Sequence, residues 1–113
     1  MILHVVLFRP RADVTEAERR GFAAALTEAR ARIPDVLHFW VGRRVADGPA
    51  YLMGGFPDFP YAAVVAVRDR AALDAYLGHP AHDAMSRYFN GTAEAALIYD
   101  YEVGEPDALG FHR

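Results

Sequence analysis

The segment Tyr76 to His82, with the sequence YLGHPAH, holds the residues of this chain best suited to chemistry. A histidine with a pKa of about 6.5 can take up a proton at neutral pH, and a tyrosine hydroxyl can donate a hydrogen bond to a developing oxyanion. Gly78 and Pro80 predict that one helix ends and another begins here, so the chain turns. Tyr76 and His82 can then point into one cavity. They are the candidate catalytic residues, for removal of a proton next to a carbonyl.

Each of these residues also has a purely structural interpretation. Tyr76 would be a core aromatic, His79 the N-cap of the second helix, and His82 a surface residue. His4 raises the same question, since it is a lone imidazole in an apolar strand. A buried histidine needs a polar partner, so His4 is either satisfied structurally or lines a polar pocket.

A metal site built from His79, His82 and His4 is a weaker alternative. The His-x-x-His spacing is common, no carboxylate stands at a diagnostic spacing, and the tight His-Pro turn opposes convergence of the two rings. We therefore expect no metal and no cofactor. The arginine pairs at 19–20 and 43–44 are interpreted as solvated faces rather than as an anion site.

Composition removes several classes of function. The chain has 113 residues and a formal net charge of −3, which indicates one globular domain without affinity for nucleic acid or an anionic membrane. It has no cysteine, all twelve basic residues are arginine, and Ser86 is the only serine, outside any nucleophile elbow. Thiolate, lysine Schiff-base and serine-hydrolase chemistry are thus excluded. With no signal-peptide pattern at its start, we expect a cytoplasmic protein.

The elements that must position these side chains follow the order β-α-β-β-α-β, with the second helical region split in two. Strands are expected at 2–8, 36–44, 61–68 and 96–103, and helices at 15–33, 69–77 and 80–89. Residues 45–60 are expected to form a long loop, and the tail from Gly104 to be loose. Right-handed crossovers in this order give an α+β, ferredoxin-like protomer with a four-stranded antiparallel sheet.

The first helix carries the clearest local signals. Thr15 and Glu18 are spaced as a capping box, and Asn90-Gly91 is expected to end the last helix near Phe89. Apolar residues of the first helix recur at spacings of four and three along one stripe, namely Phe22, Leu26, Ala29 and Ile33. Pro34 then predicts that the helix ends at about Ile33.

The first and third strands are apolar on both faces. In the first, Leu3, Val5 and Leu7 occupy one face, while His4 and Phe8 lie on the other. A sheet with one solvated face should instead alternate apolar and polar residues. Because the chain has no further element to cover the second face, we expect a homodimer in which two sheets face each other.

Five features together resemble the stress-responsive A/B barrel domain family, called Dabb, of the dimeric α+β barrel superfamily. They are MILHVVLF with His4, the Ile33-Pro34 pair, Gly42, the segment AYLGHPAHDAM and the closing LIYDYEV. The resemblance covers Met1 to Val103, so the domain is placed at 1–103 and the tail at 104–113. Members of that family are dimeric barrels with a ferredoxin-like protomer, which agrees with the homodimer expected from the strands.

The resemblance also implies an activity, since the family includes a plant polyketide cyclase, olivetolic acid cyclase, that performs a cofactor-free aldol condensation. Carried across, His82 is the base and Tyr76 its orienting or oxyanion-stabilising partner. The resemblance also implies that His4 lines the cavity, together with His79, Phe8, Phe22 and Val65. This sequence departs from the cyclase at Ala63, where the cyclase has a histidine, and an alanine cannot replace its hydrogen bonds.

Two other functions remain open. In the first, the same cavity holds an apolar or polyketide-like ligand in a non-catalytic, stress-responsive, small-molecule-binding dimer. The second, less favoured, is a cofactor-independent monooxygenase of the wider superfamily, to which His38 and Trp40 draw attention.

Overall fold

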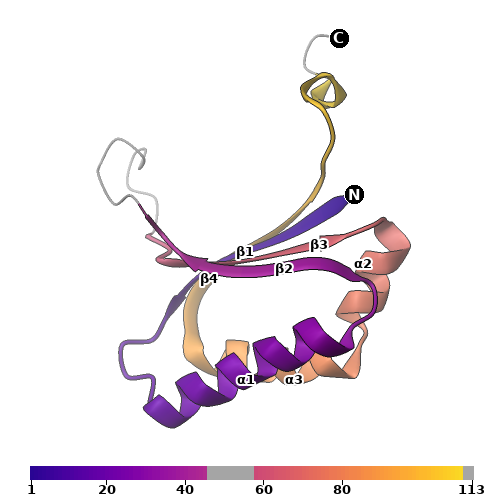
Figure 1. The fold of residues 1–113 in the computed structure, drawn as a ribbon. Helices are drawn as coiled ribbons and strands as arrows, with labels where there is room; N and C mark the ends of the chain where they lie inside the picture. Colours follow the sequence, from indigo (N-terminus) through magenta and orange to yellow (C-terminus); the bar gives the residue numbers. More distant parts are fainter. Residues whose placement is uncertain (46–57, 111–113) are drawn as a thin grey trace.

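The computed structural model describes residues 1–45 and 58–110, so most of the expected loop at 45–60 lies outside the described residues. The elements are β1 (Ile2–Pro10), α1 (Glu16–Arg32), β2 (Val36–Arg43), β3 (Tyr61–Val67), α2 (Arg70–Leu77), α3 (Pro80–Thr92), β4 (Ala93–Glu102) and the 3₁₀ helix η2 (Pro106–Leu109). The four strands form one antiparallel sheet in the order β2-β3-β1-β4, and α1, α2 and α3 lie against one of its faces (Figure 1). The predicted ferredoxin-like α+β fold is confirmed.

The α1 helix begins and ends where its local chemistry predicts. The Thr15 hydroxyl accepts from the Glu18 backbone N–H at 3.1 Å, and the Glu18 carboxylate accepts from the Thr15 N–H at 3.0 Å. This capping box satisfies two N–H groups that the first helical turn leaves free. Ile33, just before Pro34, already has an extended backbone and is buried with Ala29 in the core. Glycine at position 21 lets α1 approach α3, since a Cβ there would collide with the Tyr88 ring.

The α3–β4 junction differs from the prediction. The α3 helix runs through Asn90-Gly91 to Thr92 instead of ending near Phe89, and β4 begins at Ala93 instead of Ala96. Glycine in a helix costs only about 1 kcal/mol relative to alanine. The buried Thr92 hydroxyl donates to the Tyr88 carbonyl at 2.8 Å, and the Thr92 carbonyl accepts from the Arg11 N–H at 2.8 Å. The first bond lies within the last turn of α3, and the second ties that turn to the segment after β1. The bond to Arg11 and the pairing of β1 with β4 outweigh the local glycine signal.

The tail also differs from the prediction, because residues 106–109 form η2 instead of a loose segment. Figure 1 shows η2 projecting from the end of β4, on the side of the sheet away from the helices. Within residues 1–45 and 58–110, no helix combines the length and apolar character needed to cross a membrane.

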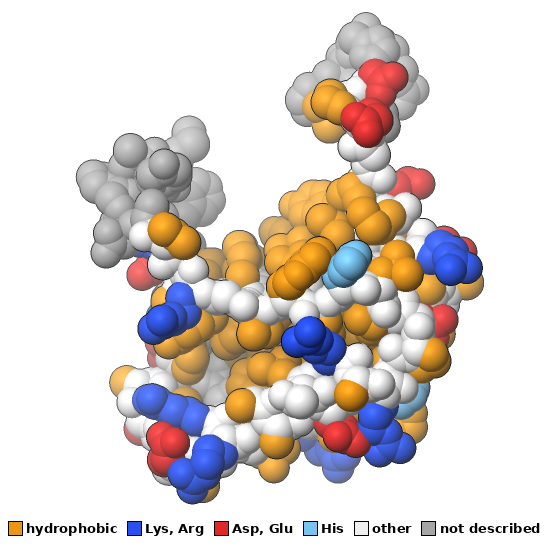
Figure 2. Space-filling model, in the orientation of Figure 1, with side chains coloured by type: hydrophobic (Ala, Val, Ile, Leu, Met, Phe, Trp, Pro, Cys, Tyr) orange, Lys and Arg blue, Asp and Glu red, His pale blue; other side chains and the backbone are white. Residues whose placement is uncertain are grey.

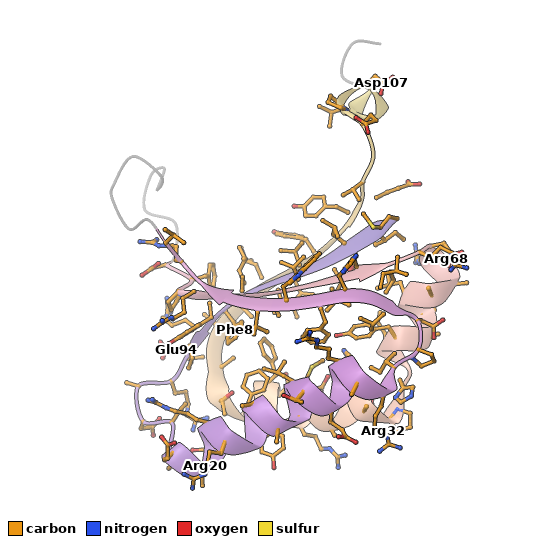
Figure 3. The ribbon with its side chains drawn as sticks, in the orientation of Figure 1. Phe8, Arg20, Arg32, Arg68, Glu94 and Asp107 are labelled. Atoms are coloured by element: carbon orange, nitrogen blue, oxygen red, sulfur yellow. The ribbon has the colours of Figure 1, made fainter. Side chains whose placement is uncertain are left out.

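The two faces of the sheet have different surroundings. Alternate residues of β1 starting at His4 face the helices, and Figure 3 shows the side chains, Phe8 among them, that fill this layer. On the opposite face the strand register aligns one apolar row across the sheet, consisting of Trp40, Val64, Val5 and Tyr99. Trp40 and Tyr99 are about half exposed, at 53% and 51%. Figure 2 shows hydrophobic side chains gathered above the sheet on this side, which we call the open face.

Candidate functional site

A cavity of about 300 Å³ lies between the sheet and the helices, and we call it the His82 cavity. Its polar groups come from four elements, with His4 on β1, Asp100 on β4, Tyr76 on α2 and His82 on α3. The rest of the wall is largely apolar and includes Val6, Phe8, Phe39, Val65, Met85 and Phe89. Ile98 and Asp100 line the cavity and are exposed, so it opens to solvent beside the edge strand β4. This is a polar cluster at one end of an apolar pocket, the usual form of a small-molecule site.

The break between α2 and α3 brings Tyr76 and His82 together. The α2 helix ends at Gly78, and His79 caps α3 by accepting from the Ala81 N–H at 3.0 Å through Nδ1. Pro80 occupies the first turn of α3, where its missing N–H costs nothing. The rings of Tyr76 and His82 consequently meet edge to face, with centroids 4.9 Å apart.

His4 reaches the same cluster from the sheet. Its ring lies edge to face with Tyr76 at a centroid distance of 5.7 Å, so Tyr76 sits between two imidazoles. Strand register places Asp100 directly opposite His4, and the His4 Nδ1 to Asp100 Oδ1 distance is 2.6 Å. The buried imidazole of His4 therefore has the partner that burial requires, and the carboxylate fixes its orientation.

Burial sets the protonation states of Tyr76 and His82. It raises the pKa of Tyr76 above its ordinary value near 10, so the phenol keeps its proton at neutral pH. Burial also lowers the pKa of His82, the nearby His4 lowers it further, and Asp83 opposes the shift. At neutral pH the site thus presents a neutral imidazole beside a protonated phenol, the states needed for a base and a hydrogen-bond donor.

The hydrogen bonds of this pair leave its reactive atoms available. His82 Nδ1 lies 3.3 Å from the Ser86 hydroxyl one helical turn away. When the serine oxygen accepts from Nδ1–H, Nε2 carries the lone pair and is the basic nitrogen. The Tyr76 hydroxyl makes no hydrogen bond to another residue within 1–45 or 58–110, so its proton is available to a ligand.

Six of the seven residues placed at this site from the sequence line the cavity. They are Tyr76, His82, His4, Phe8, Phe22 and Val65. His79 does not line it, because its imidazole is occupied as the cap of α3. Across the part of the chain that the structure describes, no three His, Asp or Glu residues form a group able to hold a metal. Ala63 is on the wall, opposite Val6 in the strand register.

Three polar residues of the cavity, Asp100, Ser86 and Asn90, were missed by the sequence analysis. Asn90 was interpreted only as a residue that ends the helix. Asp100 is a lone carboxylate within the apolar and aromatic strand LIYDYEV, and that contrast was the available signal. Ser86 stands four residues after His82, which on a helix puts both side chains on one face. The first signal does not identify His4 as the partner of Asp100, because that pairing depends on strand register. The second does not show that Ser86 and His82 line a cavity, because the cavity is formed by helix and sheet together.

The geometry can now be compared with known proteins. Residues 2–103 match the family described as the stress responsive A/B barrel domain, or Dabb. The chain belongs to this family. Comparison with curated proteins gives no match for this Dabb chain.

Solved structures share the fold of this Dabb protein at low sequence identity. A dimeric ferredoxin-like protein of unknown function from Thermobifida fusca is 22% identical with a TM-score of 0.70, covering 90% of each chain. The hydroxynitrile lyase from Passiflora edulis is 17% identical with a TM-score of 0.75, covering 92% of this chain and 94% of its own. SnoaB from Streptomyces nogalater, a cofactor-independent oxygenase, is 16% identical with a TM-score of 0.66, covering 93% and 96%. At these identities the likeness establishes the fold alone.

Proposed function

We propose that this Dabb protein is a cofactor-free enzyme of the cyclase or isomerase type, which removes a proton from a carbon next to a carbonyl in a polyketide-like substrate. The observation that carries this proposal is the Tyr76–His82 pair, with ring centroids 4.9 Å apart in an apolar cavity of about 300 Å³. An apolar wall suits a small organic substrate, and the lowered pKa of His82 keeps the base neutral.

The proposed reaction starts when Nε2 of His82 takes the proton from the carbon between or beside the carbonyls. The negative charge moves to the carbonyl oxygen, and the Tyr76 hydroxyl donates a hydrogen bond to this enolate. The enolate carbon then attacks a second carbonyl of the same molecule, forming the carbon–carbon bond of an aldol product. The imidazolium of His82 returns its proton to the new alkoxide, so the enzyme ends the cycle unchanged.

The test uses a linear 3,5-dioxo acyl thioester as substrate and separates the cyclised product by liquid chromatography. We expect His82→Ala to lower kcat roughly 10²–10⁴-fold as loss of the base, and Tyr76→Phe to lower it roughly 10²-fold as loss of the oxyanion donor. Arg87→Ala and Tyr88→Phe, at exposed positions of α3 that line neither cavity, are the controls and should retain activity. Unchanged turnover in His82→Ala would exclude the mechanism.

Two alternatives give different results in the same experiment. A non-catalytic binding protein would bind the thioester without forming product, and its affinity would survive His82→Ala. A cofactor-independent oxygenase, a class represented by one related fold, would consume oxygen with a quinol substrate. The aldol chemistry is favoured here because a neutral base and a free phenol share the cavity.

We further infer that the protein works as a homodimer joined through the open face. The row Trp40, Val64, Val5 and Tyr99 leaves apolar surface in water that a second sheet would cover. Three of the related structures are described as dimeric. Light scattering should give a dimer for the wild type and for Ala24→Glu on the exposed surface of α1, but a monomer for Trp40→Glu. A monomeric wild type would contradict this inference.

A further inference from the structure

A second cavity, of about 440 Å³, lies at the other end of the layer between α1 and the sheet. Phe8, Phe22 and Leu26 line both cavities, so they separate this space from the His82 cavity. Its remaining wall comes from the first half of α1 and the adjoining ends of the strands, and includes Val14, Ala23, Val41 and Tyr61. Figure 2 shows a hollow with hydrophobic side chains between the two layers and basic side chains at its rim.

Arg19 and Arg43 are the charged residues of this wall, and we call the space the arginine cavity. Within residues 1–45 and 58–110, neither guanidinium lies within ion-pair distance of a carboxylate. Their sequence neighbours differ, since Arg20 lies 3.5 Å from Glu16 and Arg44 lies 2.8 Å from Asp58. The arginine pairs 19–20 and 43–44 were both expected to be solvated faces. In each pair one arginine forms an ion pair with a carboxylate and the other lines the cavity.

The other arginines at this end are neutralised as well. Pro10 lines the cavity, and the arginines on either side of it both have acidic partners. Arg9 pairs with Glu94 at 2.7 Å, and Arg11 pairs with Asp13 at 3.0 Å and with Glu18 at 3.3 Å. Among the arginines at this end of the protein, Arg19 and Arg43 are therefore the two without an acidic partner in the described residues, and both line the apolar cavity.

We propose that the arginine cavity is a second binding site, whose ligand is a small amphipathic anion with a carboxylate on a hydrocarbon chain or ring. The hydrocarbon fills the apolar space, at about 25 cal/mol per Å² of apolar surface removed from water. The carboxylate accepts hydrogen bonds from Arg19 and Arg43, whose planar guanidinium groups suit carboxylates and stay charged at every working pH. The volume lies within the usual range for a small-molecule site, about 300–1,000 Å³.

This site binds its ligand without transforming it. No His, Asp or Glu is among the residues that line the arginine cavity in the described part of the chain. It therefore offers no general base of the kind present beside Tyr76. The proposal does not depend on the activity of the His82 cavity, and the two can fail separately.

Isothermal titration of the full chain with decanoate and with decan-1-ol tests the charge requirement. We expect decanoate to bind roughly tenfold or more tightly than the alcohol, because charge-assisted hydrogen bonds add to the same apolar burial. Arg19→Gln and Arg43→Gln should each remove most of this preference. Arg20→Gln is the matched control, since its guanidinium already pairs with Glu16. Equal affinities for acid and alcohol, or an equal loss in Arg20→Gln, would overturn the proposal.

A second pair of variants locates the hydrocarbon. Ala23 lines the cavity and is exposed on α1, so Ala23→Leu fills the space without disturbing the core. It should weaken both ligands about tenfold, whereas Ala24→Leu on the same exposed turn should not. His82→Ala should leave decanoate affinity unchanged. A loss of affinity in His82→Ala with no change in Ala23→Leu would place the ligand in the other cavity and refute the assignment.

Discussion

The His82 cavity and the arginine cavity occupy the same layer on either side of Phe8, yet they keep their polar groups in different places. In the first, Tyr76 and His4 are buried and the polar side chains touch one another. In the second, the wall is apolar and the charges of Arg19 and Arg43 stand at exposed positions. One fold thus holds two cavities of different character, and these differences underlie the separate roles that we propose for them.

The reason for the difference is the cost of burying charge. A histidine can lose its proton and a phenol can keep one, so both tolerate burial as neutral groups. A guanidinium cannot become neutral in a protein, so an unpaired arginine is stable only at the rim. Groups that exchange protons therefore collect in the interior, while groups that only attract anions stay at the mouth.

Phe8→Ala should have the largest effect, because it removes the wall that both cavities share. Phe8 is 9% exposed and packs against the rings of Phe22, Tyr61 and Phe89. We expect a loss of about 3–5 kcal/mol in the free energy of unfolding by urea. Leu37→Ala at an exposed position is the control, with a loss below about 1 kcal/mol. A similarly small loss in Phe8→Ala would mean that the two cavities do not share a packed wall.

Asp100→Asn should act on the His82 cavity alone. The carboxylate is the hydrogen-bond partner of the buried His4 at 2.6 Å, and the amide is a weaker acceptor. We expect the free energy of unfolding to fall by about 1–2 kcal/mol, with decanoate affinity unchanged. Asp74→Asn is the control, since its contact with Arg70 on the surface is 3.6 Å and contributes little. Equal losses in the two variants would contradict a special role for Asp100.

Thr15→Ala should act on the opposite cavity. It removes the cap of α1, and both Arg19 in the first turn of α1 and Val14 just before the cap line the arginine cavity. We expect a loss of about 1 kcal/mol in the free energy of unfolding and weaker decanoate binding, with turnover at His82 retained. Thr15→Ser keeps the hydroxyl and should restore both properties. Failure of the serine variant to restore them would exclude capping as the cause.

The smallest expected effect concerns the protonation of His82. Burial is the main cause that lowers its pKa, and electrostatic interaction with His4 lowers it further. In the unfolded chain the imidazole has its ordinary pKa of about 6.5, so the unfolded chain binds this proton more strongly than the folded protein does. The contribution of neutral His82 to the free energy of unfolding is therefore present above about pH 6.5, and it is lost as the pH falls through the pKa of His82 in the folded protein. NMR titration of the imidazole should show a midpoint below 6.5 that rises in His4→Gln, and a midpoint above 6.5 would contradict the assignment.

Much of the fold could be predicted because its signals are local. The Thr15–Glu18 capping box, the His79 cap and the Pro80 start are confirmed as predicted from neighbouring residues. The end of α3 was predicted wrongly at Asn90-Gly91, where local propensity was outweighed by the bond between the Arg11 N–H and the Thr92 carbonyl and by the pairing of β1 with β4. Local rules succeed where the partners are close in sequence, and fail where a distant strand supplies the stronger bond.

The sequence by itself determined the element order, the apolar character of both sheet faces and the turn that lets Tyr76 and His82 converge. Those properties follow from periodicity and from residues with fixed backbone preferences. Only the tertiary structure decided that Asp100 partners His4, 96 residues apart in the chain, and that Arg19 and Arg43 share one cavity. Contacts of this kind depend on strand register and on helix packing, which no stretch of neighbouring residues encodes.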